Sequence, residues 1–439
     1  MPRHVAVRAR SIFGGLRVPS RRWLAAALGL LAVTATATAV TVEALRPAAP
    51  PSTPTRVAIR VACTDAAACA AAEAIALDVW SEARGPALPL DVVVAADALP
   101  GLRARGVTWQ VLVPDIDAAA RAEAARLRAP AAARPTDWFA DYRDYRAIAT
   151  HLHELAELAP ARASVHGIGS TLDGRTIWAL HVGGAAPDAT PMLIDGTLHA
   201  REWISAMVTT CVADRLVRDY DRDPAIRDFV DHTDLWVVPV ANPDGYQHAW
   251  AGDRYWRKNR RDGHGVDLNR NFGVGWGGDG SSGFKRSEVY RGTHAFSEPE
   301  TAALRDLARR EQIALHLDFH AYGQLVLYPW GHRATPTEDQ ARFAAVGDRV
   351  ASALFAAHGE RYRLMRAVEL YPASGIMTDW MYGVAGALSY TVELRPRGGA
   401  GFVLPPSQIR PTCDEGLAAV LALRGAPTAT AANATPAGE

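Results

Sequence analysis

Short apolar or alternating runs recur through residues 137–425, and helical stretches separate them. A strand buried on both faces reads as an apolar run, whereas a strand buried on one face alternates apolar and polar residues. Strands that alternate with helices predict an α/β sheet covered by helices on both faces. The runs are "RTIWALHVGG", "PMLIDGTLH", "DLWVVPVAN", "IALHLDFH" and "ALSYTVELR", and "YRAIATHLHELAEL" predicts an amphipathic helix.

Residues 56–127 predict a second, smaller unit. "VAIRVAC", "LPLDVVVAA" and "VTWQVLVPD" are typical of strands, while "DAAACAAAEAIALDVWSEA", "DALPGLRARG" and "IDAAARAEAARL" are typical of helices. Their order is β-α-β-α-β-α, which indicates a compact α+β unit. A chain of 439 residues has room for such a unit beside one large domain.

Three segments have no periodic pattern and are expected to lie outside these units. Residues 45–55 form a proline-rich linker, and residues 128–136, "RAPAAARPT", form a second connecting segment. Residues 426–439 are of low complexity and are predicted to be a disordered tail. The two domains are therefore expected at 56–127 and 137–425.

Residues 1–44 have the composition of an export signal, because arginines precede the apolar stretch "WLAAALGLLAV" and small residues follow it. This stretch is short for the ~20 residues of a spanning helix, so we favour a cleaved signal and a secreted or periplasmic protein over a membrane anchor. Four cysteines in an exported chain suggest disulfides. The simplest pairing places one bond in each domain, Cys63–Cys69 and Cys211–Cys413, and two pairs of buried thiols are the alternative.

Polar side chains with metal-binding spacing follow the run "PMLI". His199 and Glu202 lie in "HARE", directly after a predicted strand, where open α/β sheets form their clefts. A zinc site for hydrolysis needs three protein ligands and one open position for water. His320, at the end of another predicted strand, is the best third ligand, whereas His316 is expected to be a core or supporting histidine. The same spacing in "HLHE" lies inside the amphipathic helix and predicts only a solvated face.

Motifs spread over residues 137–425 occur in the order found in zinc metallocarboxypeptidases. They are "HAREW", "NPDGY", "YWRKNRR", "DLNRNF", "YRGTHAFSEPET", "HAYGQLVLYPWG", "YPASG", "TDW" and "VELRP". One such motif alone is weak, but the ordered set is specific, and the chain closely resembles the carboxypeptidase A/B branch. The resemblance implies a mixed eight-stranded sheet with helices on both faces and one Zn²⁺ per chain. It also implies that residues 56–127 form a ferredoxin-like prodomain similar to the activation domain of that branch.

The resemblance implies a chemical role for several motif residues. The residues that match the family's zinc ligands are His199, Glu202 and His320. Glu393 in "VELRP" matches the catalytic glutamate, which accepts the proton of the attacking water and later delivers one to the leaving amine. Arg257 in "YWRKNRR" matches the arginine that stabilises the oxyanion. Asp267 would orient the zinc-bound His199.

An exopeptidase must recognise a free carboxylate, and the planar fork of an arginine suits that geometry. Asn269 and Arg270 in "DLNRNF" match the family's carboxylate clamp. Tyr371 in "YPASG" matches the mobile tyrosine that closes over it. Further subsite residues implied by the resemblance are Arg201 and Tyr322.

Two other functional classes remain alternatives. A cell-wall peptide amidase of the same superfamily could share the zinc ligands, but it would not need Arg257 together with the carboxylate clamp. A non-enzymatic binding module should have lost Glu393 or a zinc ligand, and none is missing. Lys+Arg and Asp+Glu both number 47, so nothing indicates a nucleic-acid partner. We expect a monomeric metallocarboxypeptidase that acts on the C-termini of peptides and proteins.

The side-chain preference depends on the specificity pocket. Thr378 matches the position at the floor of that pocket and supplies no charge. Asp318 lies two residues before His320, so on a strand both side chains point to the same side. Asp318 could attract a basic terminus or merely hydrogen-bond within the pocket wall, and Arg366 could neutralise it. We favour apolar or aromatic termini over a broad or basic preference.

The separate unit at 56–127 contributes none of these residues, and in the resembling branch such a unit covers the active-site cleft until a protease removes it. We therefore expect a zymogen with an activating protease as partner. Arg126 and Arg128 precede small or apolar residues, whereas Arg134 precedes a proline, so cleavage is expected near Arg128–Ala129. A permanent folding chaperone or accessory domain is the alternative.

Overall fold

In a computed structural model the described residues are 54–63, 65–81, 89–128, 136–184 and 186–425. The expected signal segment 1–44, nearly all of the linker 45–55, the Ala129 side of the expected cleavage site and the tail 426–439 lie outside them. Within the described ranges, no helix combines the length and the apolar character that a membrane crossing requires.

The smaller unit contains a four-stranded antiparallel sheet of order β2-β3-β1-β4. Its strands are β1 (Arg56–Val61), β2 (Asp78–Val79), β3 (Leu90–Ala95) and β4 (Trp109–Val113), and its helices are α1 (Ala66–Glu73), α2 (Leu99–Ala104) and α3 (Ile116–Leu127). The order β-α-β-β-α-β confirms the ferredoxin-like expectation. The expected helix over 65–83 is wrong in its second half, because α1 ends at Glu73 and β2 follows it.

The large domain is built on a mixed eight-stranded sheet of order β11-β10-β12-β9-β7-β8-β6-β5, as expected. Its strands are β5 (Ala163–Ser170), β6 (Thr176–Gly183), β7 (Thr190–Gly196), β8 (Thr233–Val238), β9 (Leu315–Ala321), β10 (Leu325–Tyr328), β11 (Arg363–Arg366) and β12 (Leu388–Leu394). The centre of the sheet is parallel, because β7 pairs with β8 and β9 and β9 pairs with β12 in the same direction. Parallel strands end at the same edge of a sheet, so side chains that follow β7 and β9 are brought together.

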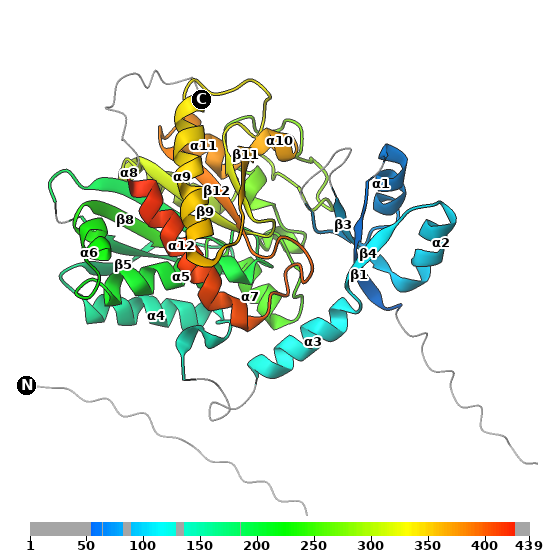
Figure 1. The fold of residues 1–439 in the computed structure, drawn as a ribbon, viewed down its shortest axis with the longest axis horizontal. Coiled ribbons are helices and arrows are strands. Elements are labelled where there is room, and N and C mark those ends of the chain that lie inside the picture. Colours follow the sequence, from blue (N-terminus) through cyan, green and yellow to red (C-terminus); the bar gives the residue numbers. More distant parts are fainter. Residues whose placement is uncertain (1–53, 64, 82–88, 129–135, 185, 426–439) are drawn as a thin grey trace, which may run out of the picture. The chain divides into compact units, whose positions relative to one another are not determined.

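Helices cover both faces of this sheet (Figure 1). In β7, Met192 and Ile194 pack into one apolar core, and Leu193 between them packs into the other. The first core is completed by α4 (Tyr145–Leu158), α5 (Trp203–Arg218), α6 (Pro224–Asp231), α7 (Pro243–Ala251), α9 (Gln340–His358) and α12 (Ile409–Arg424). The second is completed by α8 (Pro299–Arg310) and α11 (Met377–Gly383), while the short α10 (Ala367–Leu370) follows β11.

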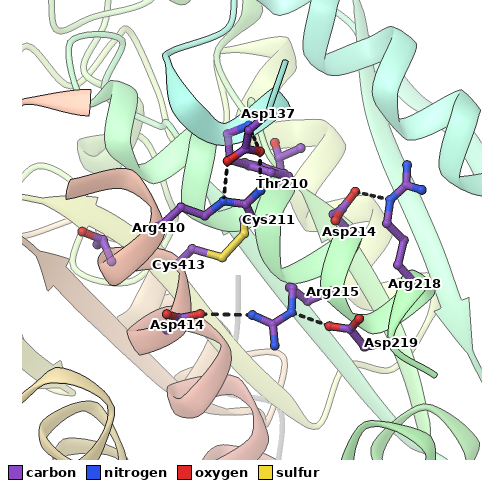
Figure 2. The surroundings of a disulfide bond; sticks show 12 residues. Asp137, Thr210, Cys211, Asp214, Arg215, Arg218, Asp219, Arg410, Cys413 and Asp414 are labelled. Atoms are coloured by element: carbon purple, nitrogen blue, oxygen red, sulfur yellow. Dashed lines mark hydrogen bonds and ion pairs between the residues drawn. A yellow bond between two sulfur atoms is a disulfide. The ribbon is translucent and has the colours of Figure 1, made fainter. Parts of the chain in front are cut away.

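Two disulfides join the four cysteines, one in each domain, as the simplest pairing predicts. Cys63 and Cys69 are close in the sequence, with Cα atoms 5.3 Å apart. Cys211 in α5 and Cys413 in α12 are 202 residues apart in the sequence and 5.9 Å apart between Cα atoms. Figure 2 shows this second bond with an ion pair on the same two helices, between Arg215 and Asp414.

Candidate active site

The sequence-predicted metal ligands come together at the carboxyl ends of β7 and β9. His199 follows β7, Glu202 immediately precedes α5, and His320 lies near the end of β9. Trp203, the first residue of α5, stacks on Trp250 with ring centroids 4.4 Å apart, and this packing fixes the start of the helix. The strand ends and the start of α5 therefore bring the three polar side chains together.

The geometry of these three residues fits a metal ion. His199 Nδ1 lies 2.8 Å from Glu202 Oε1, and His320 Nδ1 lies 3.1 Å from both His199 Nδ1 and Glu202 Oε2. All three side chains are at most 2% exposed. Two zinc–nitrogen bonds at a tetrahedral angle would place the nitrogens about 3.3 Å apart. The group His199, Glu202 and His320 can therefore hold Zn²⁺ with little rearrangement, through Nδ1 of each imidazole.

Charges around this group favour the ionised carboxylates that a cation needs. Burial alone would raise the pKa of Glu202, but the facing His199 and His320 outweigh it and lower that pKa to about 2. Burial would also raise the pKa of Asp267, yet Arg257 and Arg270 lower it far below its usual range. Asp267 Oδ1 lies 3.3 Å from His199 Nε2, on the side of the ring that faces away from the ligand group. Both carboxylates are thus negative at neutral pH.

Arg257 is held beside the metal-binding group by Asp267. Its Nε and Nη2 donate to Asp267 Oδ2 at 3.2 and 3.0 Å, and its Nη1 lies 3.3 Å from His199 Nδ1. Only 3% of Arg257 is exposed. A buried guanidinium fixed in this way is a preorganised positive charge, which can stabilise a negative oxygen without reorganising.

Glu393 lies on β12, directly beside the metal-binding group. Its Cα is paired with that of His320 on β9, and the side chain is 6% exposed. A cavity of about 490 Å³ is lined by both Glu393 and Glu202. A buried carboxylate that shares a cavity with a metal-binding group can serve as a general base for a water molecule there.

Two of the three residues expected to form the carboxylate clamp, Arg270 and Tyr371, are in contact, and Asn269 immediately precedes Arg270. Arg270 Nη2 donates to Tyr371 Oη at 2.7 Å, and Asn269 Oδ1 accepts from the backbone N–H of Met377 at 2.9 Å. A side chain at Gly375 in "YPASG" could not fit, because its Cβ would lie 2.5 Å from the carbonyl oxygen of Arg270, and the φ of Gly375 is +74°. The motif thus allows the segment after Tyr371 to approach the backbone of Arg270.

Thr378 and Asp318, which are expected to line the specificity pocket, are buried and already engaged, and Arg366 is partly exposed. Thr378 Oγ1 lies 2.5 Å from Thr391 Oγ1. Asp318 Oδ2 lies 2.8 Å from His320 Nε2, whereas Arg366 pairs with Glu369. An apolar cluster packs against Tyr371, and its buried members are Leu327, Met365, Ala367, Leu370, Ala373 and Ile376.

Arg201 and Tyr322, the two further residues expected in the subsites, are contacted by carboxylates of the 56–127 unit. Arg201 Nη1 donates to Asp78 Oδ2 at 3.0 Å, and Tyr322 Oη donates to Asp91 Oδ2 at 2.7 Å. Neither aspartate is marked by a pattern in the sequence. Asp78 lies in a stretch predicted to be helical, and no local pattern marks a contact between residues 123 positions apart.

The remaining histidines of the predicted patterns have structural roles. His151 of "HLHE" is buried, stacks on Trp138 and lies 2.8 Å from Asp214 Oδ1, so of the pair His151 and Glu154 only Glu154 lies on the expected solvated face. His316 is buried between Ser389 Oγ and Asp195 Oδ1, at 2.7 and 2.8 Å, which fits a core histidine.

The His–Glu–His group at these strand ends matches the ligand set found in a class of zinc-dependent hydrolases. The zinc carboxypeptidase family matches residues 148–419. Metallocarboxypeptidase A of Arthroderma otae is 34% identical over 366 residues, which are 79% of this chain and 86% of the relative. Carboxypeptidase A1 of Rattus norvegicus is 32% identical over 367 residues, which are 80% of this chain and 87% of the relative.

A solved structure agrees with these relatives. The crystal structure of thrombin activatable fibrinolysis inhibitor superposes with a TM-score of 0.78 at 28% identity, over 84% of this chain and 98% of that one. The chain therefore belongs to the zinc carboxypeptidase family, and it is a metallocarboxypeptidase.

Proposed function

We propose that this site removes the C-terminal residue of peptides and proteins, with one Zn²⁺ held by His199, Glu202 and His320. A bound zinc ion would polarise the scissile carbonyl and make a water molecule easier to deprotonate. Glu393 would take the proton of the attacking water and return one to the leaving amine. Arg257 would stabilise the negative charge that develops on the carbonyl oxygen. The observation that carries this proposal is the convergence of the ligand group, Arg257 and Glu393 on one buried point.

Asn269, Arg270 and Tyr371 would bind the free carboxylate of the substrate. The hydrogen bond between Arg270 and Tyr371 supports this role, because it already brings a guanidinium and a phenol to one place. Charged hydrogen bonds contribute about 1.5–3 kcal/mol each. Amidating the substrate's C-terminus should therefore nearly abolish cleavage, measured as kcat/KM on a peptide and its amide. Efficient internal cleavage of the amidated peptide would support the cell-wall amidase alternative instead.

For the side-chain preference we propose apolar or aromatic C-terminal residues. The apolar cluster beside Tyr371 offers no charge to a basic side chain, and Asp318 faces His320. Blocked dipeptides that end in Phe, Leu, Lys, Arg or Glu test this preference, and those ending in Phe and Leu should have the highest kcat/KM. Thr378→Asp should raise the relative rate for Lys and Arg. Faster cleavage of the Lys and Arg substrates by the unchanged enzyme would establish the basic preference.

The residues contacted by Asp78 and Asp91 support a zymogen. Both aspartates belong to the 56–127 unit, and they engage Arg201 and Tyr322, the two proposed subsite residues. Trp80 of the same unit stacks on Tyr255, with ring centroids 5.2 Å apart. The cavity that contains Glu393 is also lined by Trp80 and Asp91. The unit would therefore compete with a protein substrate for the outer part of the site.

We further propose that the chain is exported by way of residues 1–44 and acts as a monomer. Two disulfides support export, because such bonds persist in oxidising compartments. Mass spectrometry of the protein recovered outside the cell should find a new N-terminus within or just after this segment. Retention of the full N-terminus in the membrane fraction would favour the anchor instead.

A further inference from the structure

The outer nitrogen of His320 faces a buried carboxylate. Asp318 Oδ2 lies 2.8 Å from His320 Nε2, and the two residues share one side of β9. Asp318 has no measurable exposure and His320 is 1% exposed. Among the described residues, Asp318 Oδ1 has no hydrogen-bond partner and Asp318 pairs with no arginine or lysine. The carboxyl group of Asp318 is thus directed at one imidazole ring.

This contact decides which nitrogen of His320 carries the proton. A carboxylate only accepts hydrogen bonds, so Nε2 donates to Asp318. With a cation bound between Nδ1 and the carboxylate of Glu202, the lone pair of Nδ1 would be directed at that cation. The other polar neighbour of Nε2 is Asn269 Nδ2, at 3.4 Å, and an amide donor there would favour the opposite tautomer. The opposite tautomer carries a proton on Nδ1 and cannot bind a metal through that atom.

We propose that Asp318 is a positioning residue for the metal ligand His320 and does not read the substrate's side chain. It holds the ring in the metal-binding tautomer and orientation, the role that the sequence predicts for Asp267 beside His199. The two carboxylates differ in their other contacts, because Asp267 also accepts two hydrogen bonds from Arg257. This inference rests on the proposed metal site, and it removes Asp318 from the set of residues that could select a basic terminus.

The adjacent strand provides a matched control. Asp195 on β7 is the register partner of Asp318, is equally buried, and lies 2.8 Å from Nε2 of His316. His316 hydrogen-bonds Ser389 through its other nitrogen and is outside the metal-binding group. Asp195→Asn and Asp318→Asn therefore make the same chemical change beside two buried histidines, only one of which would bind zinc.

The test compares the intact wild-type chain with Asp318→Ala, Asp318→Asn and Asp195→Asn. The zinc dissociation constant is measured by competition with a chelator, and the absorption spectrum of the Co²⁺ form reports the ligand geometry. Asp318→Ala should weaken zinc binding by about 10–100-fold and alter the Co²⁺ spectrum. Asp318→Asn should lie between this variant and the wild type, because the amide oxygen can still accept the proton. Asp195→Asn should keep the wild-type affinity, and all variants should keep the ratio of kcat/KM for Phe and Lys substrates.

Two results would overturn the proposal. One is wild-type zinc affinity in the Asp318 variants; the other is a changed Phe-to-Lys ratio with zinc binding intact, which would return Asp318 to the specificity pocket. If Asp318→Ala does not fold, the comparison of Asp318→Asn with Asp195→Asn decides, and equal zinc affinities contradict the proposal. Failure of the proposed function is distinguishable, because it would appear as absent peptide cleavage by a wild-type protein that binds zinc normally.

Discussion

Turnover should depend on the carboxylate of Glu393, whereas metal binding should not. Glu393→Gln removes the proton acceptor but preserves the shape of the side chain in the cavity. We expect zinc content to stay at one ion per chain and kcat to fall by about 10²–10⁴-fold or more. The control is Glu369→Gln, which alters an exposed glutamate paired with Arg366. Normal turnover by Glu393→Gln would exclude it as the base.

Glu300, in the first turn of α8, should make the stability of the protein depend on pH. Burial raises its pKa from 4.5 to about 7, and its Oε1 has no hydrogen-bond partner among the described residues. The unfolded chain loses this proton near pH 4.5 and the folded chain near pH 7. Between these values the folded state binds more protons, so its stability falls as the pH rises.

Glu300→Gln should remove this dependence. At pH 8 the variant should be more stable than the wild type, by at most about 3 kcal/mol, because one pKa unit corresponds to 1.36 kcal/mol. At pH 4 both proteins should have the same thermal midpoint, since the glutamate is then protonated in both states. Equal thermal midpoints at pH 8 as well would show that ionisation of Glu300 does not lower the stability of the folded state.

At the scale of elements, the long apolar runs were predictable and the short strands were not. β6, β7, β8, β9 and β12 each coincide with a run that is buried because helices cover the sheet. β10 and β11 have four residues each and β2 has two, too few to establish a period. β5 contains two glycines and alternates poorly in burial, so neighbours in the sheet determine it more than its own pattern does.

Some contacts of the candidate site were also predictable from the sequence, and others were not. His199, Glu202, His320 and Glu393 stand at strand ends or in strands that the sequence marks, so their convergence was predictable. The partners of Arg201, Tyr322 and His320 were not. Asp78 and Asp91 reach the large domain only through tertiary packing, and the strand pattern places Asp318 beside His320 without indicating which group it contacts.

The disulfide between α5 and α12 should stabilise the large domain. Removing a native disulfide typically costs about 2–5 kcal/mol, and the cost is expected to increase with the length of the loop it closes. Cys211→Ser with Cys413→Ser should therefore lower the thermal midpoint of the zinc-loaded protein. The control pair, Cys63→Ser with Cys69→Ser, opens a loop with a sequence separation of only 6 and should have a smaller effect. Equal midpoints for the two double variants would contradict this expectation.

At the scale of the whole molecule, activity on protein substrates should depend on whether the 56–127 unit is still attached. Limited trypsin treatment should cut near Arg128, release the unit and raise this activity. Arg126 is a poorer site, because it is paired with Asp141 in the fold. The measurement is cleavage of a folded protein substrate before and after treatment, with the cut located by mass spectrometry. If residues 45–439, shown to be uncut, already match the cleaved form, the unit does not inhibit.

One contact of that unit can be tested without a protease. Asp78→Asn weakens the ion pair with Arg201, so the uncut protein should gain activity on protein substrates. Asp97→Asn, an exposed aspartate of the same unit, is the control and should change nothing. A gain of the same size in both variants would indicate that the unit had merely been destabilised.

The bond between Cys211 and Cys413 also constrains the order in which the molecule can be completed. A chain emerges from the ribosome N-terminus first, and Cys413 follows β12, the last strand of the eight-stranded sheet. Cys211 can therefore form this disulfide only after every strand of the sheet has been synthesised. In an exported chain both thiols reach oxidants only after passing the membrane, so this cross-link would form only after export. Protein produced in a reducing cytosol should contain the complete sheet but lack the disulfide between Cys211 and Cys413.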